Sequence, residues 1–89
     1  MTPRQIGLAR HALGLPNKRK EPYRNHFVAG VGHTDYQDWL EMVASGEAIR
    51  VKGNALTGGD DVFHLTLMGV WTALKGDEKL TKEIFVKIL

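Results

Sequence analysis

The sequence predicts a small α+β domain in the order helix, long loop, helix, β-hairpin, helix, followed by a C-terminal tail over residues 77–89. Three observations support this prediction: threonines that can cap helices, apolar residues at helical spacing behind them, and short alternating segments joined by glycine-rich turns. All 89 residues are expected to form one domain, because a chain of this length leaves no room for two cores.

The first helix is expected over residues 3–13. Thr2 is a suitable N-cap, and Gln5 can reach back to complete a capping box. Gly14 suits the left-handed position that ends a helix. The face expected to pack inward consists of Ile6, Ala9 and Leu13.

Residues 15–33 are predicted to form a long basic loop. Pro16 and Pro22 break helices, and neither a helical nor an alternating period is visible. Loops of this length in a small domain are usually functional, or else they contain secondary structure that the sequence pattern does not reveal. Three residues are expected to anchor the loop to the core: Tyr23, Phe27 and Val28.

The second helix is expected to begin at Thr34, which forms a capping box with Gln37, and to end at Gly46. Its apolar stripe consists of Tyr36, Trp39, Leu40 and Val43. Trp39 and Trp71, which both fall on apolar helical stripes, are therefore expected to be core residues.

After the second helix the spacing changes from helical to alternating. A strand over residues 49–52 is expected to return as a strand over residues 62–65, with a glycine-rich tip between them. Thr66 then caps a third helix that closes at Gly76. The residues expected to face inward from this helix are Leu67, Val70, Trp71 and Leu74.

The tail has two interpretations. Its last seven residues, 83–89, are rich in β-branched side chains and favour an added edge strand or a docked tail. Leu80, Ile84 and Ile88 also have helical spacing, so a helix remains the alternative. An unpacked strand here would offer an edge for strand addition by a partner.

Residues 42–50 and 62–69 resemble the second half of a winged-helix domain. In that family a helix ends at a glycine, a basic strand leads into the wing, and the return strand ends in Leu-Thr-x-x-Gly, here residues 65–69. Thr66 caps the next helix, and Gly69 would let that helix pack closely on the hairpin. The resemblance covers about half of the chain and implies a winged-helix-like core.

A winged-helix fold would place the helix before the hairpin in the major groove of DNA. That helix carries Asp35, Asp38 and Glu41, and no Lys or Arg lies between residues 34 and 46. These acids would repel phosphates, so reading of the groove by this helix is not expected.

The whole chain also resembles small uncharacterised proteins of tailed bacteriophages and prophages. The segments that carry this resemblance are residues 8–15, 23–30 and 56–63. It implies a phage or prophage origin and the cytoplasm of a bacterial host, and it carries no activity.

Composition and charge exclude some classes of function and favour others. The chain has no cysteine, so disulfides and thiolate metal sites are excluded, and a reducing compartment is favoured. No apolar run is long enough to span a bilayer, and the first residues lack the apolar stretch of a signal peptide. Residues 1–33 carry six Lys and Arg against one Glu, whereas residues 34–64 carry two against six acids. One part of the surface is therefore expected to be basic and another acidic.

The basic loop holds the strongest candidate site. Cationic side chains beside an aromatic one are what contact with nucleic acid requires, since cations hold phosphates and a tyrosine can stack on a base. The alternative is an ordinary solvated loop. The candidate nucleic-acid-binding residues are Lys18, Arg19, Lys20, Tyr23, Arg24 and His26 of the loop, with Arg50 and Lys52 of the wing. Arg4 and Arg10 of the first helix are further cations that could contact DNA.

Catalytic and metal chemistry is not expected. The tip sequence at residues 58–61 is similar to the Gly-Gly-acid signature of nucleotide cyclases, but those enzymes need a far larger domain, and a hairpin turn is the better interpretation. The four histidines, including the pair His33 and Asp35, lack the close spacing of a zinc site. No cofactor, metal or small-molecule substrate is expected, and the chain is not expected to be an enzyme.

Two hypotheses follow. The first is a non-enzymatic, phage-encoded module that contacts nucleic acid through Lys18, Arg19, Lys20 and Arg24. The second is a protein-interaction or phage-assembly adaptor, bound to a phage or host protein, that uses the acidic helix over residues 35–45 or the C-terminal edge. Neither needs a membrane.

Overall fold

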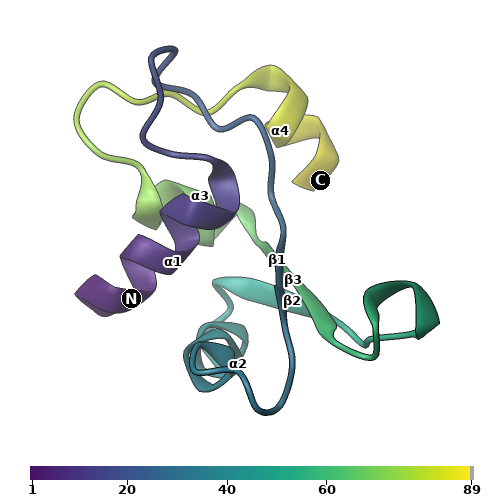
Figure 1. Ribbon diagram of the computed structural model, residues 1–89. Helices are drawn as coiled ribbons and strands as arrows, with labels where there is room; N and C mark the ends of the chain where they lie inside the picture. The colour runs from purple at the N-terminus through teal and green to yellow at the C-terminus, as the bar shows by residue number, and fades with distance from the viewer. Residues whose placement is uncertain (89) are drawn as a thin grey trace.

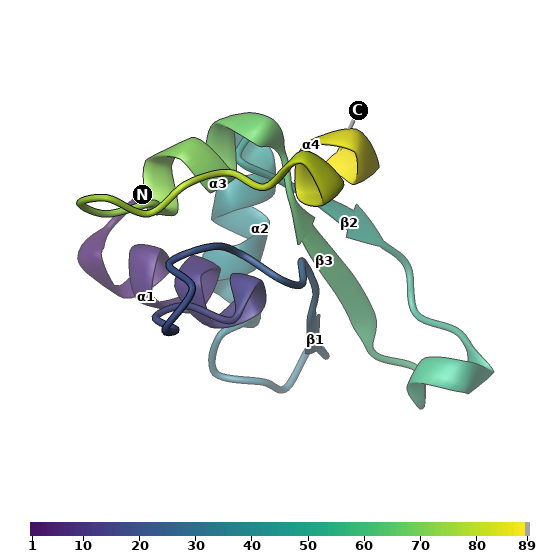
Figure 2. The same ribbon diagram turned by 90° about the horizontal axis from the view of Figure 1, so that it is seen from above.

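A three-stranded antiparallel sheet and three helices on one side of it form the core of the fold, which a computed structural model describes for residues 1–88 (Figures 1 and 2). The elements in chain order are α1 (Pro3–Leu13), β1 (Phe27–Ala29), α2 (Tyr36–Ala44), β2 (Ala48–Val51), the short 3-10 helix η1 (Ala55–Thr57), β3 (Asp61–Leu65), α3 (Leu67–Ala73) and α4 (Lys82–Ile88). The predicted α+β class and the order helix, loop, helix, hairpin, helix are confirmed. Within the described chain, no helix has both the length and the apolar character needed to cross a membrane.

β3 is the central strand, in the order β1-β3-β2. Phe27 of β1 lies opposite Phe63, and Ile49 of β2 lies opposite His64, so the predicted wing hairpin is paired. Two residues before β1, the side chain of Asn25 forms the hydrogen bonds with β3 that a strand backbone would form. Its amide N–H donates to the Leu65 carbonyl (3.0 Å), and its amide oxygen accepts from the Leu65 N–H (2.8 Å). The contact between this segment and β3 is thereby extended to two residues before β1 begins.

The core lies between the sheet and the first three helices. Trp39 of α2 is fully buried and stacks on Phe63 of β3, with ring centroids 5.5 Å apart. Phe27 packs on the same tryptophan at 5.1 Å. Ala9 and Leu13 of α1 fill the remaining space and are also fully buried. Aromatic burial of this size is a large share of the hydrophobic stabilisation of a small domain.

The other face of the sheet is open. Side chains of a strand alternate between the two faces, so the burial of Phe63 and Leu65 turns Val62 and His64 outward. Their neighbours on the outer face remain about half exposed: Val28 (45%), Ile49 (52%) and Val51 (49%). α4 lies apart from the other helices, near one end of this face, where Ile84 is 3% exposed (Figure 2).

Local capping chemistry confirms two helix starts and corrects a third. Thr2 and Gln5 form the expected capping box of α1, and Thr66 accepts a hydrogen bond from Gly69 N–H at the start of α3. α2 differs: its N-cap is Asp35, which makes no side-chain capping bond, so the capping box predicted at Thr34 is wrong. Because turns precede α2, the helix begins one residue later than expected, and Asp35 occupies the N-cap position in place of Thr34.

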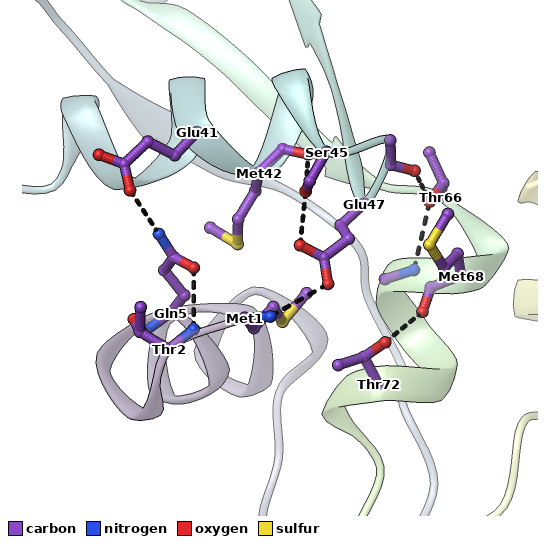
Figure 3. Close-up of polar contacts among 12 residues, drawn as sticks. Met1, Thr2, Gln5, Glu41, Met42, Ser45, Glu47, Thr66, Met68 and Thr72 are labelled. Carbon is purple, nitrogen blue, oxygen red and sulfur yellow. Dashed lines mark hydrogen bonds and ion pairs between the residues drawn. The ribbon is translucent and has the colours of Figure 1, made fainter.

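α3 packs closely on the hairpin through Gly69. A Cβ built at this glycine would lie 2.0 Å from the carbonyl oxygen of Glu47, which is backbone and cannot move aside. The Glu47 carboxylate is itself held by the Ser45 hydroxyl (2.6 Å) and the Met1 amino group (3.4 Å), as Figure 3 shows. The segment between α2 and β2 is therefore fixed from several sides, and the close-packing role expected of Gly69 is confirmed.

Several expectations about burial are wrong. Trp71 is 60% exposed. Because each helical residue advances about 100°, a residue two positions after Gly69 points almost directly away from the hairpin. In the predicted loop, Tyr23 (62%) and Val28 (45%) are exposed. Its buried anchors are Leu15, Pro22 and Ala29, together with the half-buried Phe27.

The tail and the end of the long loop also differ from expectation. Residues 82–88 form α4, so the favoured edge strand is wrong and the helical alternative holds; Leu89 lies outside the described residues. The Thr81 hydroxyl accepts from the Ile84 N–H (3.2 Å), a capping bond at the start of this helix. Residues 27–29, assigned to the loop by the sequence, form β1.

The two helical glycines provide a stability test. Gly69→Ala should lower the free energy of unfolding by about 1–3 kcal/mol, the cost of forcing an extra carbon into a packed contact. The matched control is Gly7→Ala in α1, where an added Cβ meets nothing within 4 Å. That change should raise the free energy of unfolding by about 0.5–1 kcal/mol, since alanine favours helix. Urea unfolding of both variants measures the difference, and equal effects would contradict the close contact.

Candidate nucleic-acid interface

Because β1 takes up residues 27–29 of the predicted loop, the name basic loop is kept from here on for residues 15–26, which follow a defined path. The Asn17 amide donates to the carbonyls of Gly14 (3.0 Å) and Glu21 (2.8 Å) and so closes the turn between them. Pro22 is fully buried, and the backbone carbonyl of Lys20 accepts from the Lys79 N–H (2.9 Å). The loop is thus tied to the core and to the segment before α4, while Lys18 and Arg19 are exposed at its tip.

Four of the cations considered from the sequence are engaged in ion pairs. Lys20 pairs with Asp77 (2.7 Å) and Arg50 with Asp61 (2.6 Å). Arg10 forms a two-point contact with Glu78, at 2.5 and 2.7 Å, and Arg4 contacts Asp35 and Asp38. The Lys20 and Arg10 pairs tie the basic loop and α1 to the connection between α3 and α4, the Arg50 pair joins β2 to β3, and the Arg4 pairs join α1 to the start of α2. A phosphate would have to compete with a carboxylate for each of these cations.

The remaining candidate cations have no carboxylate partner among residues 1–88. Lys18, Arg19 and Lys52 are exposed. Arg24 donates from Nε and Nη2 to the His11 carbonyl (3.2 and 2.6 Å), which fixes its side chain while its charge stays unpaired. Three of these four cations lie on the basic loop, which concentrates unpaired positive charge there.

Tyr23 and Arg24 lie together at the end of the basic loop. The guanidinium carbon of Arg24 is 5.3 Å from the centre of the Tyr23 ring. The ring lies against Gly14, where an added Cβ would be 2.1 Å from a ring carbon, and the rest of the side chain is exposed. Glycine is required at position 14 for two reasons: its φ of 78° is unfavourable for other residues, and a Cβ would collide with the Tyr23 ring.

Behind these residues lies a groove of about 780 Å³, between the end of the basic loop, the outer face of the sheet and α4. Its lining residues are Tyr23, Arg24, Asn25, His26, Ile49, His64, Leu65, Thr66, Leu67 and Ile84. None of them is acidic. The structure thus brings three predicted residues, Tyr23, Arg24 and His26, to one concave site, and places Arg50 and Lys52 outside its lining.

His64 of β3, considered from the sequence only as one of four histidines for a zinc site, is a further candidate because it lines the groove. Its Nδ1 lies 2.7 Å from the Asn25 carbonyl oxygen, so in the neutral ring Nδ1 carries the proton and donates it there. The other nitrogen, Nε2, is then an acceptor. The signal was present in the alternation of residues 61–65, which turns His64 away from the core, but a histidine on a strand does not by itself indicate a site.

The surfaces named for an adaptor are largely engaged within the chain. Asp35 and Asp38 of α2 contact Arg4, and Glu41 accepts from the Gln5 amide (3.0 Å; Figure 3). The C-terminal edge does not exist as a strand, because residues 82–88 are helical.

Asp61, one of the two acids at the end of the hairpin connection, has a structural role. Asp61 accepts from the Tyr36 hydroxyl (2.7 Å), the Gly53 N–H (2.8 Å) and Arg50 Nε (2.6 Å). The Tyr36 hydrogen bond, followed by those of Gly53 and Arg50, lowers the pKa of Asp61. His33 accepts the Asp35 N–H at Nδ1 (3.1 Å), and no group of three or more metal-ligating side chains occurs in the described part of the chain.

Comparison with known proteins finds no protein-family model, no curated protein and no solved structure that matches this chain.

The Asp61 contacts predict a pH dependence of stability. Because folding lowers its pKa from the ordinary value near 3.8, the carboxylate stabilises the fold above about pH 4, and this contribution disappears as the pH falls through the lower folded-state value. Asp61→Asn should therefore lower the free energy of unfolding at pH 7 and reduce its decline between pH 6 and pH 3. Asp60→Asn, a neighbouring change outside these three bonds, is the control; an unchanged pH profile in Asp61→Asn would contradict the assignment.

Proposed function

We propose that this chain is a non-enzymatic nucleic-acid-binding module that contacts phosphates through the basic loop. The observation that supports it is the distribution of unpaired charge: Lys18, Arg19 and Arg24 lack carboxylate partners among residues 1–88, whereas Lys20 and Arg50 have them. Unpaired cations on one segment attract a polyanion without first breaking an ion pair.

Within this proposal the contact surface is the basic loop and the groove beside it. Arg24 is already held in place by the His11 carbonyl, so little side-chain entropy is given up when it meets a phosphate. The other loop cations, Lys18 and Arg19, are exposed and can follow the backbone of the nucleic acid.

The proposal includes a winged-helix-like core of phage or prophage origin. The paired hairpin and the close contact of Gly69 with Glu47 support that core, because the motif implies both. α2 has no part in the contact, since its acids would meet phosphates of the same charge. The wing contributes Lys52, the one of its two candidate cations that has no ion pair in the described structure.

A pair of double variants tests the proposal. The double variant Lys18→Gln/Arg19→Gln should weaken binding to a short single-stranded oligonucleotide. The slope of log affinity against log salt concentration should become shallower by about 1.4, because each cation that neutralises a phosphate of a single strand contributes about 0.7 to this slope. Fluorescence anisotropy across a salt series measures both quantities.

The matched control removes the same charge elsewhere. Lys75→Gln/Lys82→Gln changes two cations of the segment that leads from α3 into α4, and neither lines the groove. This variant should keep most of the salt dependence. Equal weakening in the two double variants would show that only net charge matters and would reject the basic loop as the site.

A further inference from the structure

The groove beside the basic loop is large enough to admit a small ligand. Its volume of about 780 Å³ lies within the range of pockets that hold small ligands, and it is open to solvent along one side. Its floor is Ile49 and His64 of the outer sheet face, and Leu67 and Ile84 add apolar surface from α3 and α4. Tyr23 lines it from the basic loop, and its ring is anchored against Gly14.

Several polar groups of the lining remain free to bind a ligand, while others are already used. The Asn25 amide is taken by Leu65, and the Thr66 hydroxyl bonds the Gly46 carbonyl (2.7 Å) and the Gly69 N–H. His64 Nε2, the His26 ring and the Tyr23 hydroxyl have no hydrogen-bond partner within residues 1–88. They lie beside apolar surface, which is the mixture that a nucleobase requires: a stacking face and a few edge contacts.

Charge around the groove favours an anionic ligand. Arg24 lines it, none of its lining residues is acidic, and Lys18 and Arg19 precede it on the same segment. The phosphate next to a bound base would therefore contact Arg24, and the following phosphates would contact Lys18 and Arg19 at the tip of the basic loop.

We infer that the groove receives one unstacked base of a single-stranded nucleic acid, with Tyr23 as the stacking side chain and Arg24 as the contact to its phosphate. This inference rests on the proposed function and names its substrate class. A duplex keeps both faces of each base covered by neighbouring bases, so it can offer only its phosphates to this surface. The chain should therefore bind single strands more tightly than duplexes of the same length.

Two variants on one face of one strand test the groove. Ile49→Glu introduces a carboxylate into the floor, and Val51→Glu introduces the same charge two residues further along β2, outside the lining. Both positions are about half exposed, so both variants are expected to fold, which thermal unfolding checks. Ile49→Glu should bind oligo-dT or oligo-U at least five-fold more weakly than Val51→Glu, because removing one stacked base costs about that much or more.

A second pair examines Tyr23 without adding charge. Tyr23→Phe keeps the ring and should retain most of the affinity for the single strand. Tyr23→Leu keeps an apolar side chain beside Gly14 but removes the ring, and should weaken binding about five-fold or more.

The outcomes separate the inference from the proposed function. Tighter binding of single strands, with weakening in Ile49→Glu and Tyr23→Leu only, supports both. Equal binding of single strand and duplex, or equal affinities of Ile49→Glu and Val51→Glu, overturns the base-binding groove and leaves the phosphate-binding loop. No binding of any oligonucleotide at low salt, where charge attraction is strongest, overturns the proposed function and this inference with it.

Discussion

The stack of Trp39 on Phe63 is the contact on which the remaining structure depends. It joins α2 to β3, the central strand of the sheet, which is hydrogen-bonded to both β1 and β2. Because side chains alternate along a strand, placing Phe63 in the core also turns His64 outward to the floor of the groove. A shift of one residue in this strand would bury the histidine and expose the aromatic ring. Core packing and the candidate site are therefore two consequences of a single register.

Asn25 connects that register to the basic loop. Its side chain forms with Leu65 the two hydrogen bonds that a strand backbone would form. The N–H and carbonyl of Leu65 are therefore bonded although the chain is not a strand at this point. The residues just before it are released from strand geometry, and Tyr23 and Arg24 can turn toward Gly14 and the His11 carbonyl. A regular strand in their place would send alternate side chains to opposite faces and would separate this pair.

How far the sequence predicts the structure depends on whether the determining interaction is local. The caps at Thr2 and Thr66 were predictable, since a capping bond spans three residues. The capping box expected at Thr34 has the same span but does not form, because α2 begins one residue later, after Asp35. The exposure of Trp71 was not, because the face that α3 buries is set by the approach of Gly69 to Glu47, which is distant in sequence. α4 was ambiguous because β-branched residues obscure its helical spacing. Among the site residues, the loop cations were visible as a charge run, whereas their ion pairs and the contribution of the sheet face required the fold.

The tip of the β2–β3 hairpin extends away from the core, and Leu56 within η1 is 96% exposed (Figure 1). The connection between the two strands spans residues 52–60, and doubling the length of such a connection costs only about 0.6 kcal/mol of closure entropy. The tip is therefore the natural attachment point for a fluorophore, an affinity tag or an inserted peptide, placed on an element that the groove does not use.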